Sequence, residues 1–190
     1  MNGKTIVIFG GYGTIGCELA KRLAAKGFSL ILCARNEYKL SLVADSLDAS
    51  YCCVDASDPE QVLACFEGVR ERFNKIDGVA FCVGSALRNA SRLAIKRTLN
   101  CIRHSANAME DNGGLITFSM CESPDEDMKM LIQSATTLYE KRKIIVKAIA
   151  PGPAHEVIDQ MEDFLLNGSK STSTHSPCPD QGFKTSFCEN

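Results

Sequence analysis

The feature that most constrains the fold is a glycine-rich stretch near the start of the chain. Residues 5–9, with the sequence TIVIF, form a short apolar run rich in β-branched residues, which is typical of a strand buried on both faces. Gly11, Gly13 and Gly16 follow, and the apolar spacing then becomes that of an amphipathic helix starting near Thr14. Glycines there let the chain turn tightly, bring backbone N–H groups to a ligand and pack the helix on the strand. The stretch therefore matches the dinucleotide-binding fingerprint, with a pyrophosphate expected at the helix N-terminus.

A tight strand–helix turn without a ligand is the alternative interpretation of these glycines. The context favours a nucleotide, because a strand precedes the turn, a helix follows it, and a second strand ends at Cys33-Ala34-Arg35, about one βαβ unit later. Gly10, Gly13 and Gly16 also stand at three-residue spacing. We therefore predict nucleotide binding at this turn.

Predicted strands and helices alternate along the whole chain. The strands are expected at 5–9, 29–34, 50–54, 78–83, 115–119 and 144–150. The helices are expected at 14–26, 37–47, from about 59 to 73, 88–111, 128–142 and 156–166. Right-handed crossovers between parallel strands then predict an α/β fold, a Rossmann-type doubly wound parallel sheet in three α/β/α layers with order 3-2-1-4-5-6. Residues 1–166 are predicted to form this domain, and 167–190, rich in Ser, Thr and Pro, a mostly disordered tail.

Composition excludes several classes of function. A net charge of −2 gives no electrostatic argument for nucleic acid, and no apolar run is long enough to cross a membrane. The first strand begins within a few residues of Met1, so we expect no signal peptide and a cytoplasmic protein. The ten cysteines lack a C-x-x-C pair, so no metal site is predicted. Most stand in predicted buried strands (Cys33, Cys52, Cys53, Cys82) or on helices (Cys17, Cys65, Cys101) and are read as buried free thiols.

From about Lys4 to Leu166 the chain resembles the short-chain dehydrogenase/reductase family. The resemblance implies that the turn after the first strand holds the cofactor pyrophosphate, through Gly10, Tyr12, Gly13, Thr14, Ile15 and Gly16. The middle glycine of the commonest family pattern falls on Thr14, so the motif is similar to the form with glycines three apart.

The end of the second predicted strand indicates which cofactor is preferred. An NAD enzyme carries a carboxylate there for the ribose hydroxyls, whereas this chain has Ala34 followed by Arg35. A small uncharged residue followed by a guanidinium suits a 2′-phosphate, so we predict NADP(H) in preference to NAD(H). A solvated arginine at a strand end is the alternative.

Three further positions are similar to the family pattern. Asp55 stands where the family contacts the adenine ring, although an Asp that caps the next helix is an equal alternative. Gly84 is the glycine that lets the adenine ribose approach, and Pro151-Gly152 matches the turn beside the nicotinamide. The cofactor site predicted through this resemblance therefore extends over several strand ends.

The catalytic residues of the family are harder to find. Tyr139 and Lys143 have the Tyr-x-x-x-Lys spacing, but they end a helix and so are expected far from the carboxyl ends of the strands, where ligands bind. The family tyrosine falls instead near Cys121 and the family serine on Met120, with Ser119 one position earlier. Neighbouring strand residues face opposite ways, so Ser119 could serve only if the strand end twists or bulges.

Two functional hypotheses follow. The first is an NADP(H)-binding oxidoreductase that acts on an unknown carbonyl or alcohol substrate, with Ser119 as candidate catalytic residue together with a water or a substrate group. The second is a non-catalytic dinucleotide-binding protein, such as a sensor, a partner subunit or a pseudo-enzyme. A product shortened from a longer gene is a third reading. The resemblance also implies homo-oligomers, and an apolar stripe of Leu93, Leu99 and Ile102 fits either that interface or the core.

Overall fold

The computed structural model describes residues 3–82, 92–109, 113–120 and 126–168. It contains a six-stranded parallel sheet with the order β3-β2-β1-β4-β5-β6, as the sequence predicts. The strands are β1 Thr5–Phe9, β2 Ser29–Ala34, β3 Ser50–Cys53, β4 Gly78–Phe81, β5 Gly114–Ser119 and β6 Ile144–Ile149. The helices are α1 Thr14–Ala25, α2 Glu37–Ser46, α3 Pro59–Phe73, α4 Arg92–Ala108, α5 Glu126–Tyr139 and α6 Ala154–Asn167, with a 3₁₀ turn at Glu140–Arg142.

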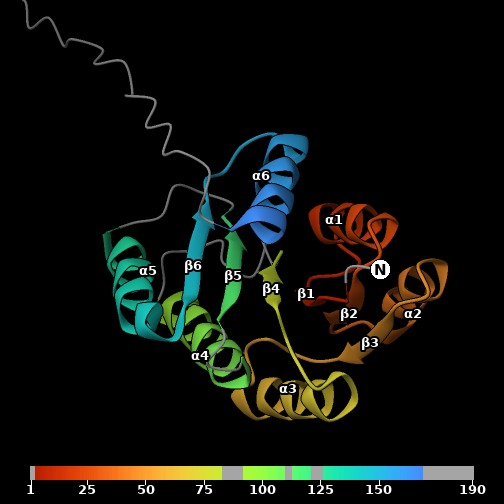
Figure 1. Ribbon diagram of the computed structural model, residues 1–190, viewed down its shortest axis with the longest axis horizontal. Helices are drawn as coiled ribbons and strands as arrows, with labels where there is room; N and C mark the ends of the chain where they lie inside the picture. Colours follow the sequence, from red (N-terminus) through yellow and green to blue (C-terminus); the bar gives the residue numbers. More distant parts are fainter. Residues whose placement is uncertain (1–2, 83–91, 110–112, 121–125, 169–190) are drawn as a thin grey trace, which may run out of the picture.

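The helices form two layers, one on each face of the sheet (Figure 1). Helices α1, α2 and α6 cover one face, and α3, α4 and α5 cover the other. Each face has its own apolar core, because successive strand residues point to opposite sides. The result is the predicted Rossmann-type α/β/α architecture.

A row of phenylalanines fixes the register at the carboxyl ends of the central strands. Phe9 pairs with Phe81 across β1 and β4, and Phe81 pairs with Phe118 across β4 and β5. Their rings are stacked, with centroids 4.7 Å apart in both pairs, and all three side chains are buried. This row holds the carboxyl ends of β1, β4 and β5 in place relative to one another. Ligands bind at this edge of the sheet in this type of fold.

Local sequence signals explain how the helices begin. Asn36 caps α2 by accepting a hydrogen bond from the Lys39 N–H at 2.9 Å, and Asp58 caps α3 through the N–H groups of Glu60 and Gln61. Pro59 occupies the first turn of α3, where its missing N–H costs no intrahelical hydrogen bond. Gln61, three residues after the cap, reaches back and accepts a hydrogen bond from the Asp55 N–H at 3.0 Å.

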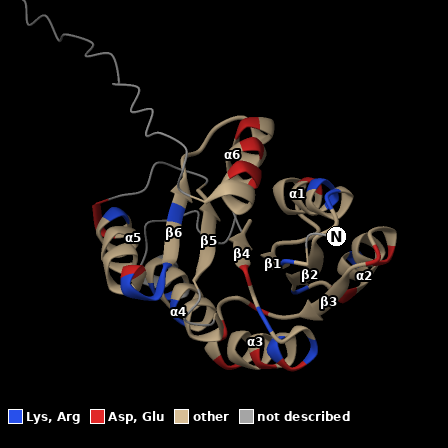
Figure 2. Cartoon of the chain, viewed as in Figure 1, with Lys and Arg blue, Asp and Glu red and all other residues tan. Residues whose placement is uncertain are grey.

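Ion pairs connect the two helices that lie side by side over the central strands (Figure 2). Arg22 on α1 pairs with Asp159 and Glu162 on α6, and Lys26 pairs with Glu162 at 3.2 Å. These side chains lie outside the apolar stripe that α6 buries, which consists of Val157, Ile158, Met161, Phe164 and Leu165.

One expectation about burial was wrong. Cys53 is exposed and Cys52 is half-buried, because β3 is an edge strand with a neighbour on one side only. Of the apolar stripe on α4, Ile102 is buried in the core, whereas Leu99 is 46% exposed, so core burial accounts for Ile102 but not for Leu99. The side chain of Leu93 lies outside the described part of the chain.

Helix α6 ends at Asn167, one residue beyond the predicted end of the domain at Leu166. Of the expected tail at 167–190, residues 169–190 fall outside the described residues, as do Gly84 and Cys121. Within the described ranges, none of the helices combines the length and apolar character needed to cross a bilayer.

Candidate nucleotide-binding site

The predicted glycine turn lies directly after β1, at the carboxyl edge of the sheet. Gly10 has a φ of +81°, a conformation that side chains disfavour. The Gly10 and Gly11 N–H groups donate to the carbonyl oxygen of Cys33 on β2, at 2.8 and 3.3 Å, and the Gly13 N–H donates to the Gly10 carbonyl at 2.9 Å. The turn is therefore held by backbone hydrogen bonds to itself and to the end of β2.

Close backbone packing explains why these positions are glycines. A Cβ atom at Gly16 would collide with the carbonyl oxygen of Gly10. A Cβ at Gly11 would lie 2.9 Å from the Cβ of Leu32, and one at Gly13 would lie 3.2 Å from the Gly10 oxygen. Each glycine thus permits a close approach that a side chain would prevent, as the fingerprint requires.

The first turn of α1 offers backbone N–H groups to an anion. Gly13 is the N-cap residue and provides no side-chain cap, and the first turn carries no acidic residue. The first N–H groups of a helix lack intrahelical partners, and the helix dipole adds positive potential there. Thr14 and Ile15, which open the helix, are exposed and half-buried respectively. The arrangement fits a pyrophosphate.

Arg35 follows the last residue of β2 and has an exposed side chain. Its guanidinium forms no ion pair within the described part of the chain, and its carbonyl accepts a hydrogen bond from the Cys53 thiol at 3.3 Å. Cys33, two residues earlier, is bonded to the glycine turn, so Arg35 stands at the same carboxyl edge. The position suits a phosphate on the adenosine ribose.

Asp55 lies beyond the end of β3, and its Oδ1 accepts hydrogen bonds from the N–H and the hydroxyl of Ser57, both at 2.8 Å. The α3 cap is Asp58, so capping of this helix does not explain Asp55. A contact with an adenine ring stays a prediction. Tyr12 in the glycine turn is 36% exposed.

Pro151 and Gly152 are exposed in the connection from β6 to α6, which also begins at the carboxyl edge. The structure therefore brings the turn after β1, the end of β2, the start of the β3–α3 loop and the β6–α6 connection to one edge of the sheet.

Ser119, the candidate catalytic residue, is the last residue of β5 and is 1% exposed. Its hydroxyl donates to the carbonyl oxygen of Phe81 at 3.4 Å. The next residue, Met120, is 8% exposed and its N–H donates to the Ile149 carbonyl. In this conformation the Ser119 side chain is enclosed.

Tyr139 and Lys143 lie at the opposite, amino edge of the sheet, as the sequence predicts. Tyr139 ends α5, and Lys143 immediately precedes β6, where its carbonyl accepts from the Gly114 N–H at 3.2 Å. Because the glycine turn follows the carboxyl end of β1, these two residues belong to the other end of the parallel strands.

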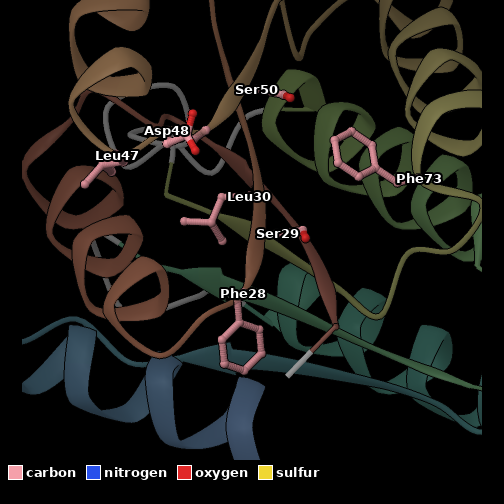
Figure 3. A pocket seen from close by; sticks show the side chains of 8 residues that line it. Phe28, Ser29, Leu30, Leu47, Asp48, Ser50 and Phe73 are labelled. Carbon is pink, nitrogen blue, oxygen red and sulfur yellow. The ribbon is translucent and has the colours of Figure 1, made fainter. Parts of the chain in front are cut away.

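A hollow of about 160 Å³ also opens at the amino edge (Figure 3). It is lined by the starts of β2 and β3, the residues after α2 and the end of α3: Phe28, Ser29, Leu30, Leu47, Asp48, Ala49, Ser50 and Phe73. No predicted cofactor residue contributes to it. It is therefore separate from the glycine turn.

Sequence reasoning missed the role of the Cys33 backbone. Its carbonyl anchors the glycine turn, and its thiol lies 3.6 Å from the thiol of Cys65 on α3. A carbonyl acceptor leaves no trace in a residue pattern. The thiol contact could be anticipated only from the inward positions of Cys33 on its strand and Cys65 on its helix. Within the described residues, no group of Cys, His, Asp and Glu is arranged to hold a metal ion.

A parallel doubly wound sheet with a glycine turn on a helix N-terminus defines a dinucleotide-binding class of protein. The family model for short chain dehydrogenases matches residues 4–114, more than half of the sequence, and the chain belongs to this family.

Individual relatives are more distant. A stretch of 50 residues is 42% identical to a very-long-chain 3-oxoacyl-CoA reductase of Candida albicans, covering 26% of this chain and 14% of that protein. A short-chain dehydrogenase from Oenococcus oeni superposes with a TM-score of 0.73 and 21% identity, covering 87% of this chain and 91% of the other. A metagenomic short-chain oxidoreductase in complex with NADP gives a TM-score of 0.71 and 18% identity, over 90% and 94% of the two chains. These likenesses support the fold.

Proposed function

We propose that this protein binds NADP(H) at the carboxyl edge of its sheet and acts as an oxidoreductase on a carbonyl or alcohol substrate. The observation that carries the proposal is the exposed Arg35, which stands beside a glycine turn whose helix has no side-chain cap. Membership of the short-chain dehydrogenase family supports the class, and the NADP complex of a similar fold supports the cofactor.

Each part of the site has a proposed role. The backbone N–H groups of Thr14 and Ile15 hold the pyrophosphate, with Gly10, Gly13 and Gly16 keeping the space clear and Tyr12 beside it. Arg35 binds the 2′-phosphate with a charge-assisted hydrogen bond.

The remaining cofactor positions follow the family pattern. Asp55 contacts the adenine, Gly84 admits the ribose, and Pro151 and Gly152 border the nicotinamide. When bound, the cofactor supplies a hydride to a carbonyl or accepts one from an alcohol.

Ser119 is the proposed group that polarises the substrate oxygen. A hydroxyl donor near that atom would stabilise the negative charge that develops as hydride arrives at carbon. Its present partner is the Phe81 carbonyl, so the role requires the end of β5 to open. Shared sequence with a 3-oxoacyl-CoA reductase makes 3-oxoacyl thioesters the first substrates to test.

A non-catalytic dinucleotide-binding protein is the second candidate. Two observations favour it: the enclosed hydroxyl of Ser119, and the placement of the Tyr139–Lys143 pair at the edge opposite the glycine turn. Such a protein would bind nucleotide through the same residues and would transfer no hydride.

Titration with NADPH and NADH, followed by nicotinamide fluorescence, tests the binding proposal. We expect NADPH to bind more tightly than NADH. A panel of carbonyl substrates, led by 3-oxoacyl thioesters, then separates the two candidates through NADPH consumption. If turnover is found, Ser119→Ala should lower kcat without changing NADPH affinity. NADPH binding without any turnover favours the second candidate, and no binding of either nucleotide contradicts both.

A further inference from the structure

Three cysteines meet beneath the glycine turn. Cys33 on β2 is fully buried, Cys65 on α3 is 5% exposed, and their sulfur atoms lie 3.6 Å apart. Cys52 on β3 is the register partner of Cys33 and is half-buried on the same side of the sheet. We call these three residues the thiol cluster.

The thiol cluster is directly connected to the proposed nucleotide site. The backbone carbonyl of Cys33 accepts the hydrogen bonds of Gly10 and Gly11 that hold the glycine turn. Cys53, next to Cys52, bonds the carbonyl of Arg35. The thiol of Cys33 therefore faces α3, while its carbonyl holds the glycine turn. A displacement of Cys33 would shift the acceptor of the hydrogen bonds that hold the turn.

We propose that Cys33 and Cys65 form a redox modification site, in which a disulfide between them weakens binding of the nucleotide at the glycine turn. The effect on affinity rests on the proposed function, whereas the disulfide itself does not. The oxidant is a peroxide, and Cys52, the half-buried member of the thiol cluster, is its most exposed residue.

The chemistry balances in two steps. The Cys65 sulfur attacks one peroxide oxygen, the O–O bond breaks, and a sulfenic acid forms with release of water. The Cys33 sulfur then attacks the Cys65 sulfur, the S–O bond breaks, and a second water leaves as the disulfide forms. Two thiols lose two protons and two electrons, and one hydrogen peroxide is reduced to two waters.

Geometry indicates why the disulfide would disturb the turn. A disulfide bond is about 2 Å long, so sulfurs now 3.6 Å apart must approach by about 1.6 Å. Both residues are enclosed in a close-packed core with Phe9, Val54 and Phe66, which resists local collapse. We expect the strand end that carries the Cys33 carbonyl to take up part of this approach.

The environment of the thiol cluster also determines how fast Cys65 is oxidised. A hydrogen bond with Cys33 and burial raise the pKa of Cys65, which keeps its thiol protonated at neutral pH. Protonated thiols react slowly, so the site responds to sustained rather than brief exposure to peroxide.

The test treats the reduced full chain with hydrogen peroxide, blocks the remaining thiols and maps linked peptides by mass spectrometry. We expect a Cys33–Cys65 link, faster hydrogen exchange in residues 4–16, and an NADPH affinity lower by about tenfold or more, on the scale expected for a displacement near 1 Å in a preorganised site. A thiol reductant should reverse all three.

Cys65→Ala should bind NADPH normally and lose the response to peroxide, and Cys65→Ser provides a second variant of nearly native size. Cys101→Ala is the matched control, because Cys101 is also buried and its thiol contacts Ala56 rather than the cluster. Modification confined to other cysteines, such as the exposed Cys53, or a Cys33–Cys65 link that leaves NADPH affinity unchanged, would overturn the proposal. If the reduced protein binds no NADPH, the proposed function fails, while peptide mapping and hydrogen exchange still decide whether this site exists.

Discussion

The two halves of the sheet differ in how completely they match the architecture of a dinucleotide-binding enzyme. In the β1–α1–β2 half, the glycines, the uncapped helix start and Arg35 each have a geometry that a bound nucleotide would use. In the β4–β5–β6 half, Ser119 is enclosed, and the Tyr139–Lys143 pair stands at the opposite edge. Binding depends mainly on backbone shape, whereas hydride transfer needs particular side chains in place. The contrast indicates that the capacity to bind is the better-supported part of the function.

The largest effect is expected where backbone packing is tightest. Gly16→Ala places a methyl group against the Gly10 carbonyl oxygen, so we expect loss of nucleotide binding and a free energy of unfolding lower by about 1–3 kcal/mol. Gly68→Ala is the matched control. Gly68 lies in α3, and a Cβ there meets no other atom within 4 Å, so this change should stabilise the fold by about 0.5–1 kcal/mol. Denaturant unfolding measures the free energy of unfolding of both variants. Equal changes in this free energy for Gly16→Ala and Gly68→Ala would contradict the account of the turn.

Arg35→Asp tests the side-chain contribution to nucleotide binding in the β1–α1–β2 half of the sheet. Loss of a charge-assisted hydrogen bond to a 2′-phosphate is worth about 1.5–3 kcal/mol, so NADPH affinity should fall by about 10- to 100-fold. NADH affinity should be unchanged or higher. Arg70→Asp is the control for charge, because Arg70 is exposed in the last turn of α3. Equal losses for both nucleotides, or for both variants, would indicate a non-specific effect.

A smaller effect is expected from His104 on α4. Burial, and secondarily the charge of Arg103, lower the pKa of His104 below 6.5, so the folded state disfavours the protonated form. The resulting penalty is absent above pH 6.5 and grows as the pH falls through the folded-state pKa. On acidification the Tm of His104→Gln should therefore fall by less than the Tm of the wild type. At pH 8 the two proteins should have the same Tm. An equal fall of Tm in both proteins on acidification would show that His104 does not contribute to the acid sensitivity of the fold.

No effect on the site is expected from Tyr139→Phe combined with Lys143→Gln. Both residues stand at the amino edge of the sheet, away from the glycine turn. NADPH affinity and any turnover should match those of the wild type. A loss of turnover with unchanged affinity would show that this pair takes part in catalysis and would remove the contrast between the two halves.

Most of the fold could be predicted because each signal acts locally. The apolar runs gave the strands, the glycine turn marked the first strand–helix unit, and alternation with crossovers implied the sheet order. The boundaries differed by a few residues where helices fray or caps compete, as at the end of α1 and the start of α6.

The site was less predictable, because its contacts depend on the whole fold. Cys53 belongs to an apolar run, yet it is exposed because β3 has a neighbour on one side only. The sequence left Asp55 open between an adenine contact and a helix cap, and the folded structure shows that Asp58 caps α3. The hydroxyl of Ser119 could not be placed from sequence, because the direction of a side chain at a strand end depends on local twist.

The most direct test of the central claim compares two fragments of the cofactor, adenosine 2′,5′-bisphosphate and adenosine 5′-monophosphate, by calorimetric titration of the wild type and Arg35→Asp. The account predicts that the wild type binds the 2′-phosphorylated fragment more tightly by about 10- to 100-fold, and that Arg35→Asp removes this preference. Equal affinity of the wild type for both fragments would contradict recognition of a 2′-phosphate by Arg35.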